Sequence, residues 1–387
     1  MIDHIICNMS NLKERLKRVL IGITALFVLA GVAIYVFLEV APQIGGEAKG
    51  DRLVRIQNSS NYDGEIFVNT VETTMNIQPE DFPSLMWKFF TGTPGVEPED
   101  QLKTTPFTPS DYPVYADSQT AVTWFGHSTI LVKVEGKTLL FDPVFSPRTS
   151  MVSFMGPKNF NLDHYMHVDE LPEVDAVVIS HDHYDHLDYE TILALKGKVK
   201  KFFMPLGIGA HFERWEIPAE DIVEMDWWEE AEFEGLKLAL TPARHFSGRA
   251  LTDRSKTLWG SWSVIGEQER LYFSGDGGYT PEFKRIGERY GPFDLAFLEC
   301  GQYNEMWSSI HMMPEETVQA SIDLNAATMI PIHWGKFPLA LHTWKDPVER
   351  MTQEADKLGV DYLLPTIGET MILTQDRPQS RWWEKYQ

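Results

Sequence analysis

The chain has 387 residues, of which 43% are hydrophobic and 23% charged, so it is long enough for one large α/β domain or two smaller ones with sizeable cores. Its formal net charge is −22 at pH 7, and such an acidic surface repels phosphate backbones, which excludes nucleic acid as an expected partner. The two cysteines, Cys7 and Cys300, lie on either side of an apolar segment, so we expect neither an intrachain disulfide nor a cysteine-based metal site.

An uncharged, mostly apolar segment runs from residue 19 to residue 38. As a helix it would extend about 30 Å, which is the thickness of the hydrocarbon core of a bilayer. Glu39 follows the segment, and four basic residues precede it: Lys13, Arg15, Lys17 and Arg18. This asymmetry predicts a short cytoplasmic segment at 1–18, a single-pass anchor in the cell membrane, and an extracytoplasmic large domain. A cleaved signal peptide is the alternative, although its apolar core is normally shorter and no clear cleavage site follows Leu38.

Residues 42–118 are rich in Pro, Gly, Asp, Glu and Thr, which predicts that residues 39–118 form a tether and an N-terminal extension that packs on the main domain. The extension contains one apolar stretch, Phe82–Phe90. This stretch is either a helix that packs against the core or a segment that dips into a membrane surface. We expect the packed helix, because amphipathic aromatic stretches usually bury their apolar side inward.

Residues 119–387 alternate short apolar runs with helical patterns. The predicted strands are 121–125, 129–134, 138–141, 176–180, 236–240, 261–265, 271–273, 295–298 and 329–332. The predicted helices are 189–195, 314–324 and 347–358. This order indicates a strand-rich core with helices outside, in a single α/β domain.

A dense group of polar side chains, residues 181–188, directly follows one buried strand. His181 and His183 are two residues apart, so on extended backbone they point to the same side, while Asp185 and His186 follow where the chain must turn. Imidazole nitrogens and carboxylate oxygens suit zinc, and a site that lacks one protein ligand leaves a position for water. A hydrogen-bonded surface loop is the alternative, but three histidines and three aspartates within eight residues favour a metal site.

Three further candidate ligands stand at the ends of later strands: His245, Asp276 and His333. Each has an ordinary explanation by itself, as a surface loop residue, a turn aspartate or a core histidine. Their shared position at strand ends argues against three coincidences.

The pattern His-x-His-x-Asp-His after a strand resembles the metallo-β-lactamase superfamily, and more closely the branch that contains N-acyl phosphatidylethanolamine phospholipase D and bacterial RomA-like proteins. The resemblance spans about residues 80–375. It rests also on the segments Trp124 to Thr129, Phe141 to Phe145, Gly156 to Lys158, Pro242 to Phe246 and Ile332 to Gly335. It implies a four-layer αββα sandwich with metals between the sheet ends.

The resemblance also implies a ligand set for two metal ions. One ion would be held by His181, His183 and His245, the other by Asp185, His186 and His333, with Asp276 bridging them. Two Zn²⁺ are expected, with Mn²⁺ or Fe²⁺ as alternatives. A shared water would then ionise near neutral pH, so no Ser or Cys nucleophile is required.

Other polar residues have less certain roles. His311 resembles a substrate-side histidine of the phospholipase relatives and could act in catalysis beside Asp276, or could cap the helix that begins near Pro314. His127 and Ser128 could suggest a hydrolase dyad, but adjacent residues on a strand point to opposite faces, which disfavours direct contact between a nucleophile and a base. His127 is instead expected to orient a ligand. Three more residues are candidates for lining the pocket: Arg249, Glu299 and Tyr303.

The closest resemblance predicts a membrane-anchored hydrolase that cleaves a phosphodiester, such as one in an N-acyl phosphatidylethanolamine-type phospholipid. A hydrolase of another ester, such as a sugar-phosphate lactone or a β-lactam, is the main alternative, because one bimetal site serves many substrates. A di-iron redox protein is less expected, since relatives of that kind carry a carboxylate where this chain has His183. A metal-binding scaffold without catalysis is disfavoured because no expected ligand is missing.

Overall fold

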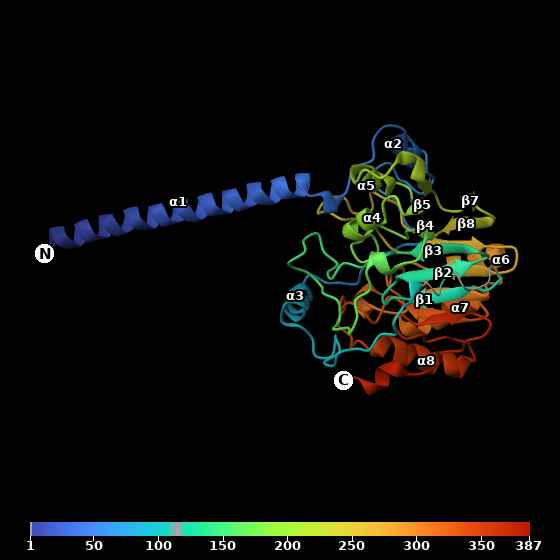
Figure 1. Ribbon diagram of the computed structural model, residues 1–387. Coiled ribbons are helices and arrows are strands. Elements are labelled where there is room, and N and C mark those ends of the chain that lie inside the picture. The colour runs from blue at the N-terminus through green and yellow to red at the C-terminus, as the bar shows by residue number, and fades with distance from the viewer. Residues whose placement is uncertain (1, 110–111, 113–117) are drawn as a thin grey trace. The chain divides into compact units, whose positions relative to one another are not determined.

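The computed structural model in Figure 1 describes residues 2–109, 112 and 118–387, and the side chains of these residues except 2–12, 89 and 90. The predicted segments 1–18 and 39–118 thus lie partly outside the described residues. The chain divides into two compact units, Met1–Ile44 and Gly45–Gln387. The predicted boundary at 118/119 does not coincide with this division, and it remains a prediction.

The first unit consists largely of the helix α1 (Ile2–Val40). Its segment Lys13–Val40 has a mean hydropathy of 2.6 over its most apolar window and is long enough to cross a membrane. The predicted span at 19–38 lies within this segment. Length and composition alone do not separate a membrane anchor from a signal sequence, so the anchor stays a prediction.

The second unit contains two β-sheets (Figure 1). The seven-stranded sheet has the order β13 (Thr370–Ile372), β1 (Ala121–Trp124), β2 (Ile130–Val134), β3 (Lys137–Phe141), β4 (Val174–Val178), β5 (Val199–Pro205), β6 (Ile222–Met225). The six-stranded sheet has the order β12 (Met329–Ile332), β11 (Leu295–Glu299), β10 (Arg270–Phe273), β9 (Ser261–Ile265), β8 (Leu236–Thr241), β7 (Glu230–Phe233). Both sheets mix parallel and antiparallel pairs.

The first sheet has an apolar core on each of its faces. Successive side chains of a strand point to opposite faces of the sheet, so they pack in different cores. Leu139 of β3 packs in a core that also holds Leu238 of the second sheet, so this core lies between the sheets. The next residue, Leu140, packs in a different core with Ile192 of α4 (Tyr189–Leu195) and Phe212 of α5 (Gly209–Arg214). These helices therefore cover the outer face of the first sheet.

Three helices accompany the second sheet: α6 (Glu282–Tyr290), α7 (Pro314–Asp323) and α8 (Asp346–Leu358). The helix α7 contacts the strand β11 and both neighbouring helices, α6 and α8. Helices thus lie outside both sheets, and the predicted αββα sandwich is confirmed.

All nine strands predicted between residues 121 and 332 are present within one or two residues of the expected bounds. Four strands were not predicted, namely β5, β6, β7 and β13.

The N-terminal extension contributes α2 (Gly50–Gln57) and α3 (Phe82–Thr91). The expectation that the apolar stretch of α3 packs inward is wrong for most of the side chains described. Leu85 is buried, but Phe82, Met86 and Trp87 are 58%, 48% and 68% exposed. The side chains of Phe89 and Phe90, which belong to the same prediction, lie outside the described residues. Leu85 packs in a small cluster with Trp307, Ile310 and Ala340, which is separate from the main core.

Candidate metal centre

The candidate ligands meet because parallel strands of each sheet end at a common edge. In the first sheet β1, β3 and β4 run in the same direction, and in the second sheet β8, β10 and β12 do so. The loops after these strands carry His127, Asp142, residues 181–188, His245, Asp276 and His333. Residues far apart in the sequence thus share one end of the sandwich.

The first group contains His181, His183 and His245. His181 Nε2 lies 2.9 Å from His183 Nδ1, which in turn lies 3.2 Å from His245 Nε2. Four tetrahedral nitrogen ligands at about 2.0–2.1 Å from zinc would lie about 3.3 Å apart, which is close to this spacing. The three nitrogens could therefore hold one divalent ion.

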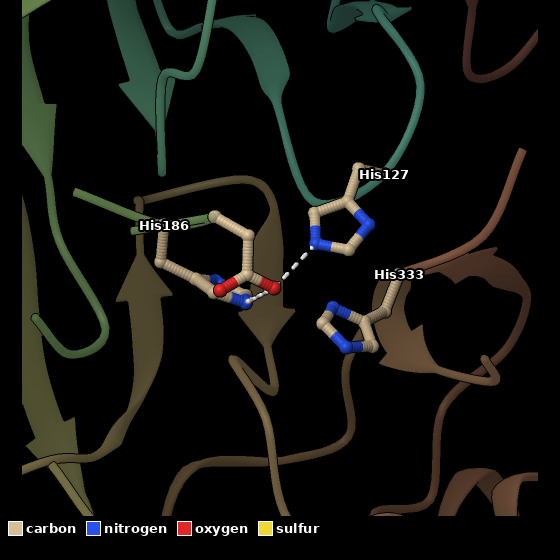
Figure 2. Close-up of side chains that lie close together, drawn as sticks. His127, His186 and His333 are labelled. Carbon is tan, nitrogen blue, oxygen red and sulfur yellow. Dashed lines mark hydrogen bonds and ion pairs between the residues drawn. The ribbon is translucent and has the colours of Figure 1, made fainter. Parts of the chain in front are cut away.

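The second group contains His127, Asp185, His186 and His333, whose candidate ligand atoms all lie within 4.8 Å of one another. Figure 2 shows the three imidazoles of this group converging from separate segments of the chain. Asp185 Oδ2 lies 2.9 Å from His127 Nε2 and 3.4 Å from His186 Nε2. This group could hold a second ion.

Asp276 lies between the two groups. Its Oδ2 is 3.8 Å from His181 Nε2 and 3.9 Å from His245 Nε2, while it is 3.0 Å from His186 Nε2. Its Oδ1 is 3.0 Å from His333 Nδ1. A single carboxylate is thus within reach of both groups, as a bridging ligand must be.

Hydrogen bonds on the far side of the rings set the orientation of three histidines. His186 Nδ1 donates to Asp142 Oδ2 at 2.7 Å, and His245 Nδ1 donates to the carbonyl oxygen of Ile310 at 2.9 Å. His181 Nδ1 contacts Ser180 Oγ at 2.9 Å. With Nδ1 occupied in this way, the Nε2 lone pair of each ring is directed into the site.

The protonation states of four of the histidines also suit a metal. Burial lowers the pKa of His183 to about 4 and the pKa values of His181, His245 and His333 well below the usual range, so these rings are neutral at pH 7 and have free lone pairs. Burial raises the pKa of Asp276 to about 7.

At the centre of the site, two buried atoms have no hydrogen-bond partner among the residues that the structure describes, namely His186 Nε2 and Asp276 Oδ1. Their contacts with neighbouring groups are close but do not have hydrogen-bond geometry. Buried polar atoms without a partner are costly, and a divalent cation would satisfy both of these atoms. The residues present therefore fit a metal centre.

The structure brings together all seven residues predicted as ligands: His181, His183, Asp185, His186, His245, Asp276 and His333. His127 was expected to orient a ligand, and its contact with Asp185 places it there, although its ring is also near enough to be a ligand itself. Ser128 Oγ contacts His333 Nδ1 at 3.2 Å rather than His127, so the two adjacent residues form no dyad.

His311 faces the site and not the helix end. Its ring centroid lies 5.1 Å from that of His245 and 5.3 Å from that of His333, and its Nδ1 is hydrogen-bonded to Glu299. The N-cap of α7 is Met313, so the alternative capping role of His311 is wrong. Glu299 lies beside the site, fully buried against His311, and accepts a 2.6 Å hydrogen bond from Gly277 N.

Two of the residues expected to line the pocket have other contacts. Tyr303 is hydrogen-bonded to Asp346 and stacks on His342. Arg249 is buried behind the ligand loop, where its Nη1 donates to the carbonyl oxygens of Asp182 and Leu187 at 2.6 and 2.7 Å. Arg249 therefore holds the loop in shape instead of lining the site.

Sequence reasoning gave no role to several residues that support the ligands. In the sequence, Asp142 belongs only to a segment that carries the family resemblance, although an aspartate directly after a predicted strand, like the proposed ligands, was a usable signal. Asp182 points away from the site, as its place between two inward histidines requires, and it accepts hydrogen bonds from His211 Nε2 and Thr257 Oγ1. The partner His211 had no signal in the sequence, since it lies 29 residues further along.

Comparison with known proteins agrees with this site. The sequence model of the family described as "Beta-lactamase superfamily domain" matches residues 137–334. The chain is 41% identical over 345 residues to the protein Mb0930 of Mycobacterium bovis, covering 88% of this chain and 91% of that one. It is 39% identical over 237 residues to N-acyl-phosphatidylethanolamine-hydrolyzing phospholipase D 1 of Caenorhabditis elegans, covering 58% of this chain and 66% of the relative.

A shorter match, 52% identical over 101 residues, joins the chain to outer membrane protein RomA of Klebsiella pneumoniae and covers 26% of this chain and 76% of RomA. Among solved structures, the metallo hydrolase Igni18 of Ignicoccus hospitalis superposes with a TM-score of 0.52 at 24% identity, covering 66% of this chain and 98% of that one.

The fold and the site define a metal-dependent hydrolase. The chain belongs to the metallo-β-lactamase superfamily, as its motifs predicted, and that family implies divalent metal ions.

Proposed function

We propose that this protein is a binuclear zinc hydrolase that cleaves a phosphodiester bond in a phospholipid of the N-acyl phosphatidylethanolamine type. The observation that carries the proposal is the position of Asp276, within 3.0–3.9 Å of histidines from both ligand groups. His181, His183 and His245 would hold one ion, and Asp185, His186 and His333 the other. When bound, two such ions activate a water molecule and neutralise the charge that develops on phosphate oxygens.

His311 would act on the substrate side of the centre. Its Nδ1 is committed to Glu299, so its Nε2 is the atom free to exchange a proton with the substrate. In phosphodiester hydrolysis, the leaving alkoxide needs a proton. His311 lies next to residues of both ligand groups, which supports the proposal that it would supply this proton. Glu299 would keep the ring in this orientation.

The choice of a lipid substrate draws support from three features. The relative from Caenorhabditis elegans is named for hydrolysis of N-acyl phosphatidylethanolamine. The helix α1 is apolar enough to anchor the chain in the cell membrane, with the catalytic unit outside the cytoplasm by the charge asymmetry around it. The exposed apolar side chains of α3 lie on a helix whose Leu85 packs with Ile310, the residue before His311.

The test is turnover by the full chain in detergent micelles, loaded with zinc. Vesicles of N-acyl phosphatidylethanolamine, bis(p-nitrophenyl) phosphate, a lactone and a β-lactam would be offered in parallel. We expect the lipid to yield phosphatidic acid and the N-acylethanolamine, and Asp276→Asn to lower the rate at least 100-fold. Asp361→Asn, a half-exposed aspartate paired with Arg377, is the matched control and should keep full activity. Turnover of the lactone or β-lactam alone would replace the phosphodiester proposal.

A further inference from the structure

Part of the N-terminal extension, residues 67–76, lies against the loop that carries His245. This loop, residues 242–250, follows β8 and has no regular secondary structure. Hydrogen bonds of 2.7–2.8 Å hold the extension there at three points: Phe67 N donates to the carbonyl oxygen of Ser255, Arg244 Nη2 to that of Glu72, and Asn76 N to that of Met306. A segment that belongs to neither sheet therefore supports a loop that carries a proposed ligand.

Asn69 is the residue of this segment that contacts the proposed ligand itself. Its Nδ2 donates to the carbonyl oxygen of His245 at 2.8 Å, and its Oδ1 accepts from His245 N at 3.1 Å. The same Oδ1 accepts a hydrogen bond from Nε1 of the buried Trp259 at 3.2 Å. An indole N–H only donates, so it fixes the Asn69 carboxamide with its oxygen on this side and its NH₂ group toward the His245 carbonyl.

The sheet does not hold the backbone of His245. The last paired residue of β8 is Thr241, and among the described residues no backbone group bonds to the N–H or the carbonyl of His245. Asn69 thus satisfies both polar backbone groups of this residue. Two hydrogen bonds to one residue fix its peptide groups, and they thereby set the direction in which its side chain leaves the loop.

The extension also touches the segment that orients the ring of His245. The ring Nδ1 donates to the carbonyl oxygen of Ile310 at 2.9 Å. Ile310 packs with Leu85 of α3, which belongs to the extension. Both the backbone of this ligand and the partner of its ring are therefore in contact with residues that precede the sheets in the sequence.

We propose that Asn69 is a positioning residue of the metal centre, which holds His245 where its Nε2 can reach the first ion. This inference rests on the proposed two-ion centre, and it adds a residue outside 137–334, the part of the chain that matches the family model. Without the carboxamide, the His245 backbone would rotate more freely, and ion binding would have to order it. Loss of a group that orients a ligand weakens metal binding about 10- to 100-fold.

The experiment is competition for zinc between the full chain in detergent micelles and a chelator of known affinity. We expect the wild type to bind two ions, and Asn69→Ala to bind one of them about 10- to 100-fold more weakly with the other unchanged. Unchanged zinc affinity in Asn69→Ala would overturn the inference. A wild-type chain that holds one ion would contradict the two-ion centre instead, and weaker binding of that ion by Asn69→Ala would still support the positioning role.

Asn61→Ala is the matched control. Asn61 also joins the extension to the rest of the unit, since its Nδ2 donates to Asp226 Oδ1 at 2.8 Å, but among the described residues its side chain bonds to no candidate ligand. Both variants should lower the melting temperature of the metal-free protein, whereas Asn61→Ala should leave the affinity for both ions within about twofold. Equal losses of zinc affinity in the two variants would reveal a general loosening of the extension and refute the role of Asn69.

Asn69→Asp decides the question if Asn69→Ala does not fold. It keeps the shape of the side chain and the oxygen that accepts from His245 N and Trp259 Nε1, but it turns a second carboxylate oxygen toward the His245 carbonyl. Two acceptors in contact repel each other, so we expect one zinc ion to bind at least about tenfold more weakly. Wild-type affinity for both ions in folded Asn69→Asp would also refute the inference.

Discussion

Replacement of Asp142 by asparagine tests whether hydrogen bonds hold the histidines of this site in the tautomer and orientation that a metal ion needs. The Asp142 carboxylate is fully buried and accepts three hydrogen bonds, at 2.7 Å from His186 Nδ1, 2.7 Å from Ser180 N and 2.5 Å from Ser180 Oγ. Asparagine keeps the shape and one acceptor oxygen, but it presents an NH₂ group to the others. His186 would then accept at Nδ1 and carry its proton on Nε2, the atom that faces Asp276.

The expected loss of zinc affinity follows from that change of tautomer. A metal needs the Nε2 lone pair, so binding must first move the proton and give up the hydrogen bond from the new amide. Loss of such a supporting carboxylate weakens metal binding or activity about 10- to 100-fold, or about 1.4–2.7 kcal/mol. We expect Asp142→Asn to weaken the affinity for one zinc ion by this factor while the other ion binds normally.

The assay is competition for zinc against a chelator of known affinity, with folding checked by circular dichroism. Asp188→Asn is the matched control, since Asp188 is also a buried aspartate beside the ligand loop. It accepts hydrogen bonds from Ser146 and Thr191 but touches no candidate ligand ring, so it should lower the melting temperature and leave zinc affinity within about twofold. Normal zinc binding by folded Asp142→Asn, or equal losses in both variants, would refute the reasoning.

Four further outcomes are expected. Elemental analysis of protein purified without chelator should give about two metal ions per chain, and a constant value near one would contradict the two-group site. Because burial raises the pKa of Asp276 to about 7, a metal must displace a proton there, so zinc affinity should rise between about pH 6 and pH 8; a flat profile would show that Asp276 is not a ligand. Burial also raises the pKa of Glu269 from 4.5 to about 7 in the folded protein. The free energy of unfolding should therefore fall as pH rises from about 4.5 to about 7, because the ionised carboxylate is less stable in the folded state than in the unfolded state. Glu269→Gln should therefore add about 1 kcal/mol to the free energy of unfolding at about pH 8, allowing for partial exposure, and nothing near pH 4, as urea titration would reveal. A C-terminal reporter that works only in the cytoplasm should stay inactive, and strong activity would reverse the predicted orientation.

The sequence predicted those strands that carry continuous apolar or β-branched runs, and it missed strands of other composition. The strand β7 reads Glu-Ala-Glu-Phe and lies at a sheet edge, where two of its side chains are exposed. The strand β5 begins Val-Lys-Lys and ends at a proline, although its later residues are buried. The edge strand β13 has three residues only. Such strands are stabilised by pairing with neighbouring strands, and this pairing cannot be predicted from the local pattern of apolar residues.

For the site, the sequence predicted the ligand types and their loops but not what supports them. The ligands stand at strand ends, and the edge at which they meet follows from strand direction. Their hydrogen-bond partners depend on distant parts of the chain: 44 residues separate Asp142 from His186, and 12 separate Glu299 from His311. No local periodicity marks such a pair, so only the packed structure reveals it.

The alternation of residues 181–183 shows how one short segment can serve both the site and its scaffold. His181 and His183 point inward with ring centroids 4.6 Å apart, and Asp182 between them points outward to His211 and Thr257. The same Asp182 accepts a 2.7 Å hydrogen bond from Gly248 N, a few residues beyond His245. One outward carboxylate therefore fixes the strand end that carries two histidines and the loop that carries the third. The spacing of the first ligand group is thus set by buried hydrogen bonds of the protein, which leaves a metal ion little reorganisation to impose when it binds.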